Sequence, residues 1–180
     1  MAKQPTIDPD ALHREAQVAA LVGLVRGDSV DDVTRAIAPT DAFRGFTPDV
    51  AILGLAVSAL DLASPSGAEP LVYEGIREQH LPEVRFRGKY EHRGSQYALY
   101  AAACKRGGLE PDLLNDAGWW QNPRLWVYAV YALVIYTRAA ADRTHVTITD
   151  IARTIAARHD LTADVDAALS DINPDAPPTG

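Results

Sequence analysis

The residues best suited to chemistry lie between positions 77 and 93, where cations and aromatic rings alternate. The members of this basic–aromatic segment that we take as a candidate site are Arg77, Arg85, Arg87, Lys89, Tyr90, His92 and Arg93. Cations bind phosphate and aromatic rings stack on bases, so the segment predicts a surface for an anion or for single-stranded nucleic acid. Glutamates are interspersed, and we favour the alternative of a solvated loop whose charges pair internally.

Two members of this segment, Arg87 and His92, are separated by four residues. This spacing resembles the short Arg-x4-His motif of HEPN-type ribonucleases, all-helical proteins whose active site forms at a dimer interface. The resemblance covers six residues and implies a metal-independent ribonuclease that uses this pair. We expect an irregular connector over 83–94, where that family has a helix, so this activity is the third alternative.

Trp119 and Trp120 are a second candidate, as part of an interface. They precede Asn122 and Pro123, a capping residue followed by a proline, so we expect them in a turn. One helix face cannot bury two adjacent rings, and exposed aromatic rings are typical of contact surfaces. The pair therefore predicts contact with a partner protein or with a second copy in a homodimer, unless both rings fold back over the core.

The remaining composition restricts the function only loosely. The net charge of −7 opposes non-specific binding to nucleic acid or to a membrane, and Cys104 is the only cysteine. The sequence holds none of the common nucleotide-binding, zinc-protease or serine-hydrolase motifs, so we expect neither a cofactor nor a metal ion. Whether the chain is an enzyme stays open.

The elements that must position these residues are helices. Capping residues before prolines at 9, 48 and 123, and Thr147 with Asp150, indicate helix starts, and we see no strand pattern. Two stretches without charge, 50–60 and 125–136, predict fully apolar helices at the centre of the bundle. The uncharged run from Leu125 to Thr137 would be about 20 Å long, too short for the roughly 30 Å of a bilayer core.

The sequence thus predicts an all-α bundle of five to seven helices. We expect a flexible tail over 1–8, one helical domain over 9–172 and a disordered proline-rich tail over 173–180. Residues 147–172 have the outline of a helix-turn-helix, but acidic residues in the second helix favour a plain hairpin. We expect a cytoplasmic, non-enzymatic binding or scaffolding module that acts through protein–protein contacts or self-association. The alternatives are an RNA- or nucleotide-binding protein and the ribonuclease.

Overall fold

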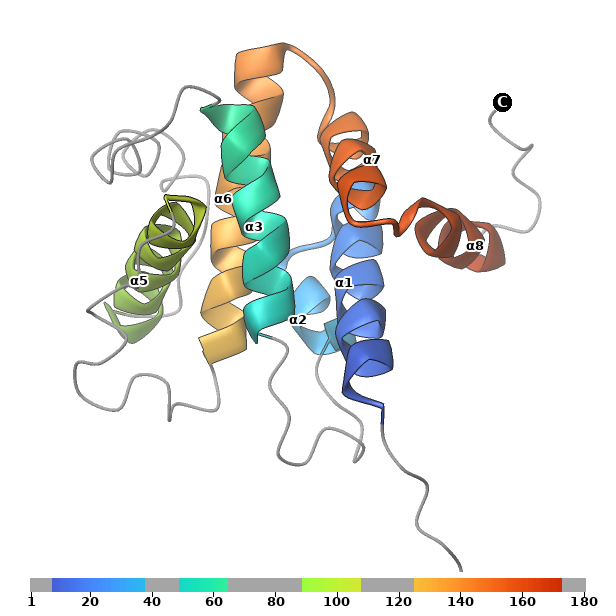
Figure 1. Ribbon diagram of the computed structural model, residues 1–180, viewed down its shortest axis with the longest axis horizontal. Helices are drawn as coiled ribbons and strands as arrows, with labels where there is room; N and C mark the ends of the chain where they lie inside the picture. Colours follow the sequence, from blue (N-terminus) through green and yellow to red (C-terminus); the bar gives the residue numbers. More distant parts are fainter. Residues whose placement is uncertain (1–7, 38–48, 65–88, 108–124, 173–180) are drawn as a thin grey trace, which may run out of the picture.

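A computed structural model describes residues 8–37, 49–64, 89–107 and 125–172, which form seven helices and no strand (Figure 1). The helices are α1 (Pro9–Arg26), α2 (Val30–Ile37), α3 (Asp49–Ala63), α5 (Lys89–Arg106), α6 (Leu125–Thr144), α7 (Ile148–Arg158) and α8 (Thr162–Ile172). The prediction of an all-α fold is confirmed for this part of the chain. None of these helices is both long enough and apolar enough to cross a lipid bilayer.

The core forms where α3 and α6 lie side by side (Figure 1). Every residue of α6 from Tyr128 to Thr137 is buried, which agrees with the absence of charge in this run. On α3, Ile52, Leu55 and Leu60 are fully buried, while other apolar residues of that helix are only half-buried. α5 packs on α3 and α6 from one side, and α1 and α7 pack on α3 from the other.

Four of the helices share one direction. In Figure 1, α1, α3, α5 and α6 run upward, so their carboxyl ends lie at the same end of the bundle, and α7 returns downward. Aligned helices add partial negative charge at that shared end, and cations stabilise it. The last turn of α3 holds no basic residue of its own. Other elements must therefore supply the cations.

Local capping sets most of the helix limits that the sequence predicts. The Asp8 side chain accepts a hydrogen bond from the amide of Asp10 at 3.0 Å, and Gly27 ends α1 with a φ of 71°. Thr147 and Asp150 form the predicted capping box of α7. Thr162 is the first residue of α8, so it lies inside the helix and not at the capping position before it.

The expectation of a connector over 83–94 is wrong from position 89 onward, where α5 begins. Glycine disfavours a helix, but Gly94 lies inside α5 and is buried against the Tyr128 ring of α6. Tertiary packing therefore overrides the weak helix propensity of glycine at this position. The Tyr128 ring also fills the space beside Gly94, so no ligand can approach the backbone there.

Candidate functional site: an apolar groove over α1

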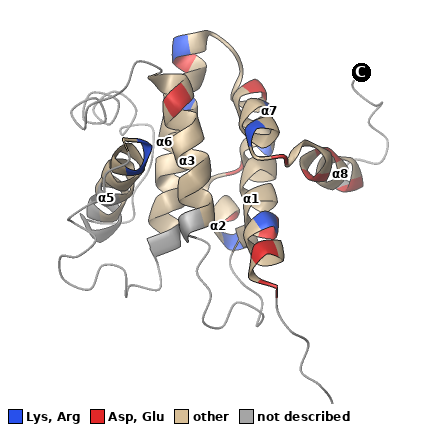
Figure 2. Ribbon diagram, in the orientation of Figure 1, with Lys and Arg blue, Asp and Glu red and all other residues tan. Residues whose placement is uncertain are grey.

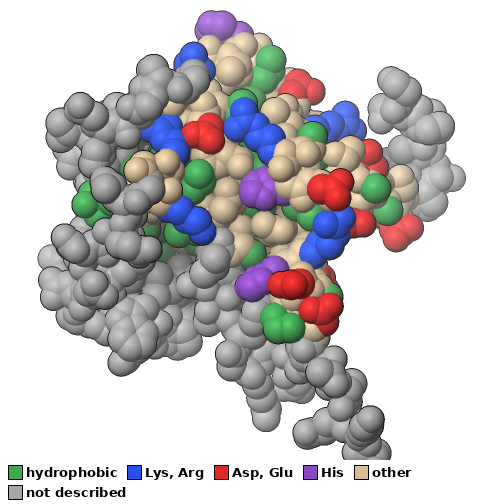
Figure 3. Space-filling model, viewed as in Figure 1, with side chains coloured by type: hydrophobic (Ala, Val, Ile, Leu, Met, Phe, Trp, Pro, Cys, Tyr) green, Lys and Arg blue, Asp and Glu red, His purple; other side chains and the backbone are tan. Residues whose placement is uncertain are grey.

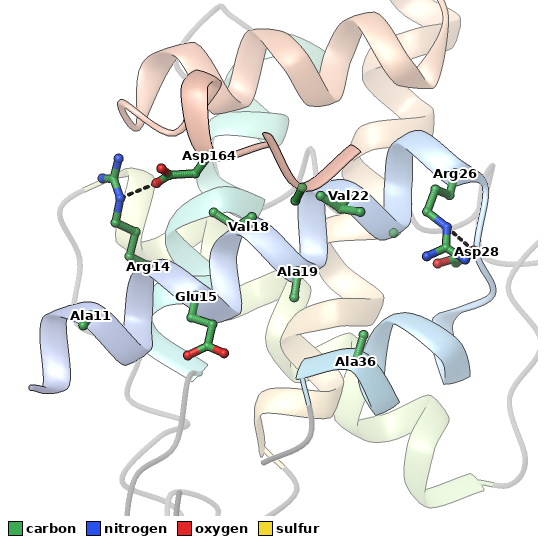
Figure 4. Close-up of a pocket in the computed structure, with 12 residues that line it drawn as sticks. Ala11, Arg14, Glu15, Val18, Ala19, Val22, Arg26, Asp28, Ala36 and Asp164 are labelled. Carbon is green, nitrogen blue, oxygen red and sulfur yellow. Dashed lines mark hydrogen bonds and ion pairs between the residues drawn. The ribbon is translucent and has the colours of Figure 1, made fainter. Parts of the chain in front are cut away.

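An apolar groove of about 510 Å³ lies over α1 in the described part of the chain. We call it the α1 groove. α1 forms its floor, and α2 and α8 form its walls (Figure 4). Its described lining consists of Ala11, Arg14, Glu15, Val18, Ala19, Val22, Gly23, Arg26, Asp28, Ala36, Asp164 and Ala168.

The groove exists because α1 is apolar on two sides. Its inner side buries Ala16, Ala20 and Leu24 in the core, as the helical spacing predicts. A second row, which contains Val18 and Val22, lies along the groove. Such a helix can bury one row within the domain and present the other to a partner.

The wall formed by α2 is set by a tight turn after α1. A Cβ atom on Gly23 would lie 2.6 Å from Cγ2 of Val33, so only glycine allows α2 to approach this closely. Ser29 then starts α2, because its Oγ accepts from the Asp32 amide at 3.2 Å and donates to the Asp32 carboxylate at 2.6 Å. This bond to Ser29, helped by Arg35, lowers the pKa of Asp32.

The wall formed by α8 is attached to α1 through Arg14. Its Nε donates to the Asp164 carboxylate at 2.5 Å, and its Nη2 donates to the backbone carbonyl of Asp160 at 2.7 Å. Asp160 has a φ of 55°, a left-handed conformation that turns the chain between α7 and α8. Arg14 thus connects α1 to both this turn and the first turn of α8.

Charge in the groove is unevenly compensated. Figure 4 shows Arg14 with Asp164 at one end and Arg26 with Asp28 at the other, where the Arg26–Asp28 distance is 3.5 Å. Both cations of the lining are therefore paired with carboxylates, whereas Glu15 has no ion pair among the described residues. α8 carries three aspartates and no basic residue (Figure 2). The surroundings of the groove are accordingly acidic.

A second cluster of charged residues surrounds the carboxyl end of α3. Arginines from three other helices donate to its carbonyl groups: Arg106 to Ser64 at 2.8 Å, Arg143 to Leu62 at 2.8 Å and Arg158 to Ser58 at 3.3 Å. Asp61 lies between Arg106 and Arg158, at 3.8 and 3.9 Å. Figure 3 shows Lys or Arg side chains and an Asp or Glu side chain gathered on the face between α5 and α7. They supply the cations that the last turn of α3 lacks.

The same region holds a serine–histidine pair that the sequence did not reveal. The Ser58 hydroxyl and Nε2 of His159 share a hydrogen bond of 2.8 Å, although the residues are 101 positions apart. Burial lowers the pKa of His159, and the charge of Arg158 lowers it further, so the imidazole is neutral at pH 7. The bond fastens the end of α7 to α3. The contact joins two helices that are distant in sequence, which is a structural contribution.

The basic–aromatic segment is only partly within the described residues. Arg77, Arg85 and Arg87 lie outside them, as do Trp119 and Trp120. Lys89, Tyr90, His92 and Arg93 lie in the first turns of α5, where the helix places positions 89, 92 and 93 on one side and position 91 on the opposite side. The Arg87–His92 pair and the tryptophan interface therefore stay predictions.

The other polar candidates are buried in the core. Cys104 is a buried free thiol, and Tyr131 and Tyr136 are almost fully buried. The Tyr136 hydroxyl donates to the Leu99 carbonyl at 2.7 Å, so the ring packs in the core while its hydroxyl is satisfied by the backbone.

Among the described residues, no group of three or more histidine, cysteine or acidic side chains is arranged to hold a metal ion. The chain matches no protein-family model, no curated protein and no solved structure. The α1 groove is therefore the feature on which a functional argument can be based.

Proposed function

We propose that this protein is a helical binding module that acts through protein–protein contacts, and that the α1 groove is its binding surface. The observation that carries the proposal is the row of valine and alanine side chains that lines the floor of the groove. Ala11 and Ala36 are exposed and Val18, Ala19 and Ala168 are half-buried, so the apolar lining remains open to a partner. Apolar grooves between helices are surfaces on which partner proteins lay an apolar face.

The groove can be blocked by a single substitution at its floor. Ala19 is half-buried in the middle of α1, and Ala19→Gln fills the groove with a polar side chain without adding charge. Ala157 is an exposed alanine in α7 and is not part of the lining. Ala157→Gln is therefore the matched control, because it makes the same change on another surface.

The test is a selection of displayed peptides on the wild-type chain, followed by measurement of their affinity for both variants. We expect selected peptides to lose at least about tenfold in affinity for Ala19→Gln, because the polar side chain stays unpaired beneath an apolar contact. Affinity for Ala157→Gln should equal that for the wild type. Peptides that bind all three proteins equally, or a selection that yields none, would exclude the groove as a protein-binding surface.

A second candidate function is binding of single-stranded RNA through the amino-terminal end of α5. The helical start of α5 supports it, because positions 89, 92 and 93 share a side from which Glu91 is excluded. Lys89→Gln with Arg93→Gln should weaken salt-dependent RNA binding, whereas Lys105→Gln, exposed at the other end of α5, should not. An unchanged titration for both proteins would remove this candidate.

A further inference from the structure

We infer that the occupant of the α1 groove is a cationic amphipathic α-helix of a partner protein, about four turns long. This inference rests on the proposed function and names the class of partner. It follows from the backbone around the groove, from the spacing of the lining residues and from the charges that border them.

The backbone of the groove favours a helix over an extended peptide. An extended peptide binds mainly by adding a strand to an open sheet edge, which offers unpaired amide and carbonyl groups. The floor and both walls of the groove are helices, whose backbone groups are bonded internally. The partner must therefore bind through its side chains, as an amphipathic helix does.

The spacing of the lining residues matches a helical partner. The row Ala11, Glu15, Val18, Val22 and Arg26 advances along α1 by four, three, four and four residues, so it forms one continuous stripe. From Ala11 to Arg26 the stripe is about 22 Å long at 1.5 Å per residue, which corresponds to about four turns of a partner helix. Small residues beside the valines leave recesses into which larger apolar side chains fit.

The charge around the groove selects a cationic helix. Arg14 and Arg26 are already paired with Asp164 and Asp28, so neither is available to a carboxylate of the partner. Glu15 lies in the lining without an ion pair among the described residues. Asp171 is exposed on α8, and the helical repeat places it on the same side as Asp164 and Ala168. Lysine or arginine beside the apolar stripe of the partner would complement these carboxylates.

The same charges disfavour a second copy of this chain as the occupant. A closed dimer formed through the groove would bring identical surfaces together. Glu15 of each copy would then approach the carboxylates that border the groove of the other copy. Like charges placed opposite each other oppose association. An external cationic helix has no such conflict.

The experiment uses two hydrocarbon-stapled helical peptides of 16 residues with the same leucine stripe. One carries lysine at the positions that flank the stripe, and the other carries glutamate there. Fluorescence anisotropy on the full chain should show that the lysine peptide binds at least about tenfold more tightly at low salt, with the difference shrinking as salt is added. Ala19→Gln should abolish binding of the lysine peptide, while Ala157→Gln should not.

A charge variant tests the role of Glu15 directly. Glu15→Gln should weaken binding of the lysine peptide about three- to fivefold, the effect of removing one rim charge. Asp166→Asn is the matched control, since Asp166 is exposed two positions from Asp164, on the opposite side of α8. Unchanged circular dichroism spectra and melting curves for both variants would show that the fold is intact.

Three outcomes would overturn the inference. Equal or tighter binding of the glutamate peptide would show that the site does not select cations, although the groove would remain a protein-binding surface. Binding of neither helix would exclude a helical partner, while the peptide selection tests the groove independently. Sedimentation that shows a dimer, and a monomer for Ala19→Gln, would identify a second copy as the occupant.

Discussion

Replacement of Gly94 by alanine tests the packing of α5 against α6. Gly94 is buried within α5, and a Cβ atom added there would lie 2.5 Å from Cδ1 and Cε2 of Tyr128. The Tyr128 ring is only 7% exposed, so it cannot turn outward without disturbing its neighbours. Either the ring or the helix must shift to admit a methyl group.

The magnitude follows from two opposing terms. Overpacking a filled core costs about 1–3 kcal/mol, whereas alanine is favoured over glycine in a helix by about 1 kcal/mol. We expect Gly94→Ala to lower the free energy of unfolding by about 1–2 kcal/mol. For a chain of this size that change lowers the melting temperature by roughly 2–8 °C.

Gly54→Ala is the matched control, because Gly54 also lies inside a helix. Its added Cβ would lie 3.8 Å from Cε1 of His159, which is ordinary contact. We therefore expect Gly54→Ala to stabilise the protein by about 0.4–1 kcal/mol. Urea unfolding followed by circular dichroism measures both changes. If Gly94→Ala were as stable as Gly54→Ala, the Tyr128 ring could not lie over Gly94. That result would refute the packing of α5 on α6 described above.

Four further results are expected. Leu55→Asp and Val130→Asp each place a charge at a fully buried position, so neither variant should show a cooperative thermal transition. A melting curve like that of the wild type would contradict the assignment of these residues to the core. Burial lowers the pKa of His159 from 6.5, so the stability linked to its neutral form is complete above pH 6.5 and is lost as pH falls through the lowered pKa. His159→Asn should flatten the pH dependence of the urea unfolding midpoint in that pH range. If the slope of the midpoint against pH were unchanged, His159 would not be the group responsible. Arg106→Ala should lower the free energy of unfolding by about 2–3 kcal/mol, because the Arg106 side chain is only 10% exposed and donates to two backbone carbonyls. A smaller loss in urea unfolding would show that those hydrogen bonds are absent. Deletion of residues 173–180 should leave the melting temperature unchanged, and a large decrease would show that this tail is docked.

The parts of the fold that the sequence predicts are the local ones. Asp8 and Gly27 determine the ends of α1 through neighbours within five positions, and the same holds for the capping box of Thr147 and Asp150. The uncharged run of α6 is likewise visible in the sequence. The start of α5 was missed because Gly94 is stabilised in the helix by Tyr128, which lies 34 positions later in the chain, and periodicity cannot show such a contact.

The α1 groove was not predicted, because the sequence of α1 alone does not say which apolar row stays open. Val18 packs partly against the core beside Ala16 and Ala20, and it also lines the groove. The open row is determined by where α2 and α8 pack. α8 is held by its buried Val165 and by the bond of Arg14 to Asp164, 150 positions away. The Ser58–His159 pair escaped prediction for the same reason.

The arginines at the carboxyl end of α3 also bear on the order in which the protein forms during synthesis. Their carbonyl partners precede Arg106, Arg143 and Arg158 by 42, 81 and 100 positions. At about 5–20 residues per second, the ribosome needs roughly 5–20 s to add the last of these intervals. During that time the end of α3 lacks its cationic donors and the apolar face of α3 lacks α6. The amino-terminal third of the chain therefore emerges before its stabilising partners, and the end of α3 acquires its full set of cationic donors only when α7 is complete.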